Sequence, residues 1–419
     1  EELYVNILYL SLALIIAGVG YLKANISTIV GKIYPQGDPR RDSGFTIFYM
    51  GINLGSLLSS ATIAWIGIVY GWAWGFGLAG IGMLAGLATF LIFQPWLEGR
   101  ADPPNPEKLK QKIFGPINVE YACYLSGLAI IAIAMLAVMN PQYMGGILGP
   151  LGLIMLAFLV IYAFTKTAGQ ERGQMFAAIY FVLAQIPFWA LFEQAGSSLT
   201  LFTDRLVDKE MFGINVPTPV FQFLNAGYIV IFAPIFAWMW IALSKRKMEP
   251  STPVKFAIGV FLAGLGFLSL VGGIGMSGAG MTAVGFIFLI YWVHTMGELM
   301  VSPVGLSAVT KLAPARVVGM TMGAWFLYSG LSNFLAGVIA SSTGAETLGG
   351  QLTDVAGAKA GYAEVYSYVG LVAMGIAVLM LLISPAIKWL MAGADDQMTP
   401  HPTATEGGGP SMDRTSDAP

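Results

Sequence analysis

Long apolar stretches constrain the fold of this 419-residue chain more than any other feature. The hydrocarbon core of a bilayer is about 30 Å thick, and a helix of about twenty mostly apolar residues can cross it. Eleven stretches reach that length, at 4–22, 45–68, 72–95, 117–139, 145–166, 175–199, 219–243, 253–273, 279–304, 317–341 and 363–392. Their continuous apolar character excludes an outer-membrane barrel, whose strands are about ten residues long and alternate in polarity. We therefore expect an all-α polytopic membrane protein with about eleven transmembrane helices.

Composition supports this class. Hydrophobic residues make up 56% of the chain and charged residues 11%, whereas soluble domains carry about 25% charged residues. The formal net charge of −2 gives a nucleic-acid partner no electrostatic support. Two histidines and the single Cys123 supply metal or triad chemistry poorly. An intramembrane enzyme is therefore disfavoured, and we expect no catalytic residue, no metal site and no cofactor.

The basic residues predict the orientation. Alternate connections between the expected spans hold sixteen Lys and Arg residues on one side and three on the other, leaving out Lys23 in a span and Arg414 in the tail. The positive-inside rule places the side with sixteen in the cytoplasm, together with the C-terminus. Glu1 is then external. Because an external start without Met opens almost at once into a span, we expect that upstream spans are missing from this sequence.

The expected spans fall into three groups. Three precede the longest internal loop, which begins at Glu98; two plain spans rich in Gly, Ala, Leu and Ile follow it; and six come after Lys166. Residues 393–419 are rich in Gly, Pro, Thr, Ser and Asp, cannot bury a core, and are expected to form a disordered cytoplasmic tail.

Two carboxylates lie inside expected spans, Glu193 in 175–199 and Glu298 in 279–304. An acid at the bilayer centre costs roughly 2.5–3.5 kcal/mol on the insertion scale, so it is rarely retained without a use. The usual uses are proton relay, substrate contact or charge compensation, which point to a transporter. The alternative interpretation is that each carboxylate forms a structural pair with a lysine or a backbone donor.

Each acid shares a helical face with other side chains. Trp189 and Glu193 are four residues apart, as are His294, Glu298 and Ser302, so each set lines one face. We favour a packing role for His294 over proton transfer.

Helix breakers flank both acids. Pro187 is expected to loosen the helix just before Glu193, because it cannot donate to the preceding turn. Pro303 with Gly305 is expected to interrupt the helix just after Glu298. The third ionisable group inside a helix, Lys23, either extends to the interface or faces a polar interior, as the neighbouring Gly, Asn and Ser residues suggest.

Three motifs carry a family resemblance. The segment 34–56 contains Phe48-Tyr49 followed by Ile52-Asn53-x-Gly55-Ser56; the segment 188–198 contains Phe188-Trp189 and Glu193-Gln194-x-Gly196-Ser197-Ser198; the segment 297–307 reads Gly-Glu-Leu-Met-Val-Ser-Pro-Val-Gly-Leu-Ser. In this order they resemble the proton-dependent oligopeptide transporter family of the major facilitator superfamily, and the likeness covers essentially residues 4–392.

The resemblance implies a layout. Residues 1–97 would be the remainder of the N-terminal helix bundle (family helices four to six), and 98–170 a cytoplasmic linker with the two extra helices of bacterial members. Residues 171–392 would form the C-terminal six-helix bundle, followed by the tail 393–419. Nothing here corresponds to the first-helix Glu-x-x-Glu-Arg motif of the family, so the fold would be a major facilitator fold lacking about three N-terminal helices.

The resemblance also implies site residues. In the family, the lysine at the position of Lys23 helps to hold the peptide carboxylate, and Glu298 would face the α-ammonium. The implied substrate-binding residues are Lys23, Asn53, Trp189, Asn225, Glu298, Ser302 and Trp325, with the two tryptophans as apolar walls. The implied proton-coupling residues are Glu193, Glu298 and Lys23.

The expected activity is therefore that of a proton-coupled symporter that imports di- and tripeptides by alternating access. It would lie in the bacterial cytoplasmic (inner) membrane as a monomer, surrounded by lipid, with protons as the coupling ion. Two alternatives remain open. The same fold could carry another small solute such as nitrate or an amino acid, or this chain could be a truncated, non-transporting fragment, either a receptor or inert.

Overall fold

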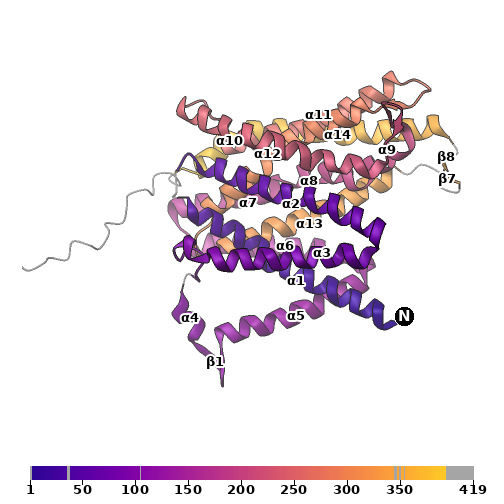
Figure 1. The fold of residues 1–419 in the computed structure, drawn as a ribbon. Helices are drawn as coiled ribbons and strands as arrows, with labels where there is room; N and C mark the ends of the chain where they lie inside the picture. The colour runs from indigo at the N-terminus through magenta and orange to yellow at the C-terminus, as the bar shows by residue number, and fades with distance from the viewer. Residues whose placement is uncertain are drawn as a thin grey trace, which may run out of the picture.

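The computed structural model describes residues 2–34, 38–103, 105–343, 347–348, 351–352 and 354–392. Long helices dominate it and run side by side (Figure 1). The unbroken long helices are α1 (Glu2–Ile33), α2 (Arg41–Tyr70), α3 (Trp72–Phe93), α5 (Val119–Met139), α6 (Met144–Lys166), α10 (Phe223–Lys245), α11 (Thr252–Met276), α12 (Gly285–Leu312), α13 (Val318–Ser342) and α14 (Val355–Leu390). The tail predicted to be disordered, 393–419, lies outside the described residues.

One expected span is broken into four pieces. They are α7 (Gly169–Ala184), α8 (Ile186–Phe192), the 3-10 turn η3 (Glu193–Gly196) and α9 (Ser198–Leu206). Pro187 lies in the first turn of α8, where its missing N–H costs no helical hydrogen bond. The predicted loosening before Glu193 is thus confirmed, and it places this acid in a 3-10 turn.

The predicted interruption after Glu298 is wrong. Helix α12 continues to Leu312 with Pro303 inside it. Neighbouring helices pack tightly on this stretch, since a Cβ added at Gly305 would come within 2.1 Å of the Trp325 side chain. Gly305 therefore serves close packing of α13 on α12 rather than a break.

Short elements connect the long helices. The connection from α3 to α5 contains η1 (Gln94–Leu97), α4 (Pro106–Lys110) and an antiparallel pair, β1 (Lys112–Phe114) with β2 (Ile117–Asn118). The remaining short elements are η2 (Pro141–Tyr143), β3 (Val207–Asp208), β4 (Glu210–Met211), β5 (Ile214–Asn215), η4 (Thr218–Gln222), β6 (Thr282–Ala283), β7 (Thr347–Leu348) and β8 (Gln351–Leu352).

The expectation of an all-α polytopic membrane protein is confirmed. Within the described residues, ten helical segments are long and apolar enough to cross a membrane. Helix α2 is not one of the ten, although its 30 residues cover the predicted span 45–68.

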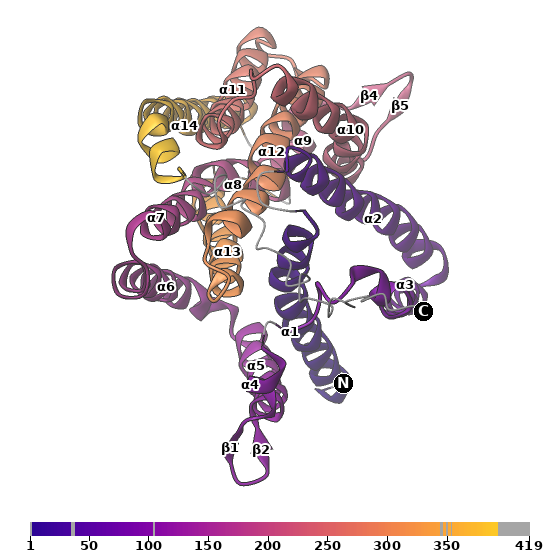
Figure 2. The same cartoon turned by 90° about the vertical axis from the view of Figure 1, so that its left-hand side faces the viewer.

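Burial is uneven among the helices. In α12, 72% of the most apolar 18-residue window is buried, whereas in α3 none of it is. Helix α12 packs against α2, α10, α11 and α13, and Figure 2 shows α3 and α5 at the edge of the arrangement. The helix that carries Glu298 is therefore central, which sets the environment of that acid.

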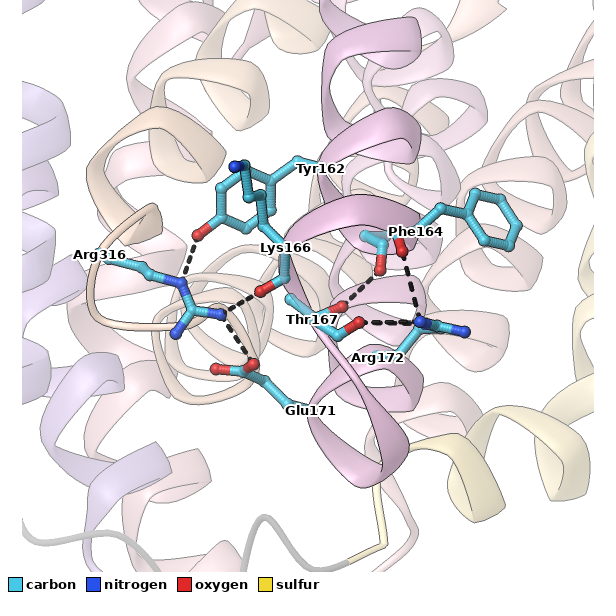
Figure 3. A network of polar contacts seen from close by, with 8 residues as sticks. Tyr162, Phe164, Lys166, Thr167, Glu171, Arg172 and Arg316 are labelled. Atoms are coloured by element: carbon cyan, nitrogen blue, oxygen red, sulfur yellow. Dashed lines mark hydrogen bonds and ion pairs between the residues drawn. The ribbon is translucent and has the colours of Figure 1, made fainter.

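A polar network joins the second plain helix, α6, to the helices that follow it (Figure 3). Arg316, in the loop after α12, donates to the Tyr162 hydroxyl at 2.6 Å, to the Lys166 carbonyl at 2.6 Å and to Glu171 Oε2 at 2.7 Å. The carboxylate of Glu171 raises the pKa of Arg316. Because both partners of this ion pair are partly exposed, the pair fixes geometry more than it adds stability.

Candidate functional site

Glu298 lies at the centre of a buried hydrogen-bond network. Its side chain is 2% exposed. Oε1 accepts from the Tyr49 hydroxyl at 2.5 Å, and Oε2 accepts from Asn225 Nδ2 at 2.6 Å. The two donors come from α2 and α10, so the carboxylate connects three helices. A buried carboxylate is tolerated only where such donors satisfy it.

Thr295 supports this network from one turn earlier in α12. Its Oγ1 accepts from Asn225 Nδ2 at 3.1 Å and donates to the Tyr291 carbonyl at 2.7 Å. The Asn225 amide is therefore held between a hydroxyl and a carboxylate. Ser302, one turn after Glu298, is also buried. Asn53 donates to the Tyr49 carbonyl at 3.0 Å and lies half-buried beside this group.

Glu193 has a more open environment. It is half-buried in η3. The amide nitrogen of Asn333, oriented toward the carboxylate, donates to Oε2 at 3.0 Å and to Oε1 at 3.1 Å. This orientation follows because the amide oxygen would otherwise face only acceptors. Asn333 is on α13 and is exposed.

Lys23 is exposed on α1, with Nζ 5.6 Å from the centre of the Phe326 ring. Within the described part of the chain it forms no ion pair, but its charge acts on Glu193. Other cations are more deeply buried: Lys255 is 1% exposed and Lys359 is 5% exposed. Lys23 thus lies close enough to Glu193 to interact with its charge, but it forms no ion pair with it.

The two predicted tryptophan walls differ. Trp189 is half-buried in α8, edge-to-face with Phe188 and Phe192 at ring distances of 5.5 and 5.2 Å. Trp325 is 2% exposed and packs near Phe256, with 6.3 Å between ring centroids. Trp325 therefore belongs to the helix packing in this structure, and its role as a wall stays a prediction.

His294 has the surroundings of a packing residue. It is 3% exposed, its Nε2 is 3.0 Å from the Ala263 carbonyl oxygen, and it lies between the rings of Phe192 and Phe267. A backbone partner and aromatic neighbours satisfy the ring, as the packing interpretation predicts.

A second polar cluster joins α2 to α11 and α12 at the end of α2 expected to be cytoplasmic. Lys255 Nζ donates to Asp42 at 3.0 Å and to Glu249 at 2.5 Å, and Ser307 donates to Asp42 at 2.6 Å. A cavity of about 530 Å³ borders these residues and Arg41. This cluster and the Tyr49–Glu298 contact form two layers along α2.

Sequence reasoning did not assign a role to Tyr49 or Asn333. Tyr49 lies inside a quoted motif four residues before Asn53, so helical spacing could have placed both on one face. Asn333 follows Trp325 by eight residues, with Ser329 midway, which again is one face of a helix. No feature of the sequence around Asn333 indicates that it contacts Glu193, which lies 140 positions earlier in the chain.

Comparisons with known proteins place the chain among transporters. The PTR2 model of the POT family matches residues 2–355. The transporter YclF of Bacillus subtilis is 35% identical over 389 residues, which are 92% of this chain and 75% of that protein. The peptide transporter YePEPT of Yersinia enterocolitica is 33% identical, over 94% of this chain and 77% of that protein.

Solved structures agree in fold. A crystal structure of peptide transporter POT in complex with sulfate has a TM-score of 0.64 and 32% identity, covering 89% of this chain and 73% of the other. A POT family transporter in complex with 5-aminolevulinic acid has a TM-score of 0.62 and 27% identity, covering 86% and 73%. These similarities confirm the expected major facilitator type of fold, and the family and its relatives are transporters.

Proposed function

Because the chain belongs to the POT family of multi-pass membrane transporters, we propose that it is a proton-coupled symporter for di- and tripeptides. It would lie in a bacterial cytoplasmic membrane with its C-terminus in the cytoplasm. The relatives named as peptide transporters or permeases support this cargo. The observation that carries the proposal is the buried Glu298 carboxylate, with donors from α2 and α10.

A short peptide is a zwitterion, so its binding site needs an anion for one end and a cation for the other. Glu298 supplies the anion and Lys23 the cation. Asn53, Asn225 and Ser302 supply polar partners for backbone amides, and Trp189 an apolar surface for side chains. A pocket built mainly on apolar contacts discriminates weakly by size, which suits cargo of varied side chains.

The ammonium of a peptide would join the Glu298 network beside the two neutral donors, because each carboxylate oxygen can accept a second hydrogen bond. Tyr49 is on α2, whereas Asn225 and Glu298 are on later helices, so the peptide would bind at a contact between the two expected bundles. Opening the cytoplasmic side would further require the Asp42–Lys255 and Asp42–Ser307 contacts to separate. Glu249 would then remain with Lys255 and keep its charge compensated.

Proton coupling requires an acid whose protonation changes during the cycle. Burial disfavours the charged form of a carboxyl, and a nearby cation favours it. Glu193 is half-buried, and the positive charge of Lys23 is close enough to interact with its carboxylate. Movement of Lys23 toward a peptide carboxylate would therefore promote protonation of Glu193. Each unit of pH gradient supplies about 1.4 kcal/mol per proton.

The direct test is uptake of radiolabelled dialanine by proteoliposomes under an inward proton gradient. We expect accumulation that a protonophore removes and that excess trialanine inhibits. The second candidate cargo is a small amino acid, since one similar structure holds 5-aminolevulinic acid. Uptake of an amino acid or nitrate without uptake of dialanine would contradict the peptide assignment.

A further inference from the structure

Asn333 contacts the acid that the proposed mechanism uses for proton coupling. With its amide nitrogen oriented toward the carboxylate, as the surrounding acceptors require, Asn333 donates to Glu193 Oε2 at 3.0 Å and to Oε1 at 3.1 Å. Among the described residues, it is the side chain that donates hydrogen bonds to this carboxylate. The contact joins α13 to η3, which pack against each other.

The position of Glu193 makes this contact informative. The residue lies in a four-residue 3-10 turn between two short helices, α8 and α9. Glu193 is half-buried and Asn333 is exposed, so the contact lies at the boundary of the packed helices. A hydrogen bond from a neutral amide favours the ionised carboxylate over the protonated acid.

The charged groups around Glu193 are few. The positive charge of Lys23 on α1 interacts electrostatically with Glu193. The charge of Glu193 in turn interacts with the carboxylate of Glu298 on α12. Helices α8 and α13 contain no Asp, Glu, Lys or Arg. In α9, Asp204 is paired with Lys209, and Arg205 is near the far end of that helix. The titratable Tyr328 of α13 donates to the Gly152 carbonyl instead.

We propose that Asn333 is a positioning residue that holds the Glu193 carboxylate in place and sets the pH at which it takes up a proton. This inference rests on the proposed function. Lys23 supplies the charge that can leave for a peptide, whereas Asn333 supplies a neutral donor that stays. Movement of Lys23 away from Glu193 would then change the protonation of an acid whose geometry remains fixed.

The test compares Asn333→Ala and Asn333→Asp with Asn140→Ala as the matched control. Asn140 is half-buried at the C-terminal end of α5, and its side chain donates to the Leu136 carbonyl of that helix at 2.9 Å, far from Glu193 in the sequence. In Asn333→Ala, gradient-driven dialanine uptake should fall about tenfold, the low end for a hydrogen bond to a charged group. Counterflow exchange, which needs no net proton movement, should stay within about twofold because the peptide contacts are intact.

Asn333→Asp places a second carboxylate beside Glu193, and two neighbouring carboxylates retain a proton more readily. Its uptake–pH profile should therefore move to more alkaline pH by about one unit or more, while Asn140→Ala keeps the wild-type profile. Unchanged profiles in both Asn333 variants would overturn the proposal.

A transport-independent measurement separates this proposal from the proposed function. Infrared titration of the carboxyl band, taken as the difference between each protein and its Glu193→Gln counterpart, reports the protonation of Glu193 directly. We expect protonation at higher pH in Asn333→Asp and in Asn333→Ala than in the wild type. If the wild type transports no dialanine, this titration still decides the role of Asn333, and identical titrations would reject it.

Discussion

Glu298 and Glu193 are both acids inside expected membrane spans, but their surroundings differ. Glu298 is 2% exposed, and two neutral donors from different helices each bond one of its oxygens. Glu193 is half-buried, with an exposed amide and an exposed lysine near it. Donors from two helices hold the first carboxylate where a ligand cation could pair with it, and the partly open surroundings of the second suit proton exchange. Under the proposed function, this difference leads us to expect substrate binding at Glu298 and proton coupling at Glu193.

The largest effect should come from Glu298→Gln, which removes the proposed partner of the peptide ammonium. Removing one member of a buried charged pair costs about 2–5 kcal/mol, so uptake of dialanine should fall by about thirtyfold or more. Gradient-driven uptake and counterflow should fall together, while expression is spared because the helix becomes less polar. Glu364→Gln, at an exposed position of α14, is the control, and normal uptake by Glu298→Gln would remove this residue from the binding site.

Lys23→Ala should affect the more open acid. Gradient-driven uptake should be lost, and any residual uptake should peak at higher pH, because Glu193 loses the cation that favours its ionised form. Measuring uptake against external pH checks this. A wild-type profile would favour the interpretation in which Lys23 only extends to the membrane interface.

Tyr49→Phe should produce a smaller effect at the buried acid. It removes one of two hydrogen bonds to Glu298, and a hydrogen bond to a charged group contributes about 1.5–3 kcal/mol. We expect KM for dialanine to rise by about tenfold or more with little change in the pH profile. Tyr228→Phe is the control, since the Tyr228 hydroxyl makes only a long contact of 3.5 Å to the Phe288 carbonyl. Equal kinetics in the two variants would show that Tyr49 does not support Glu298.

Much of the fold follows from the sequence, because span length and the position of Pro187 are local properties. Membrane-length apolar runs predicted the long helices, and Pro187 predicted the break before Glu193. The break predicted at Pro303 was wrong, because the packing of Trp325 against Gly305 is a tertiary effect that the local sequence does not show.

The sequence likewise indicates the two acids of the candidate site, but not the side chains that contact them. Intramembrane acids stand out in any apolar sequence because their insertion is costly. Their partners are less visible, since Tyr49 and Asn333 reach Glu298 and Glu193 from helices distant in the sequence. Helical spacing fixes which residues share a face, but not which other helix that face meets.

The measurement that tests the division of roles most directly is transport by Glu193→Gln in two modes. Gradient-driven uptake of dialanine should vanish, because an amide cannot carry the proton. Counterflow exchange of dialanine between equal pH compartments should survive near the wild-type rate, because Glu298 and its donors are unchanged. Equal loss of both activities would contradict the account and give Glu193 a structural role.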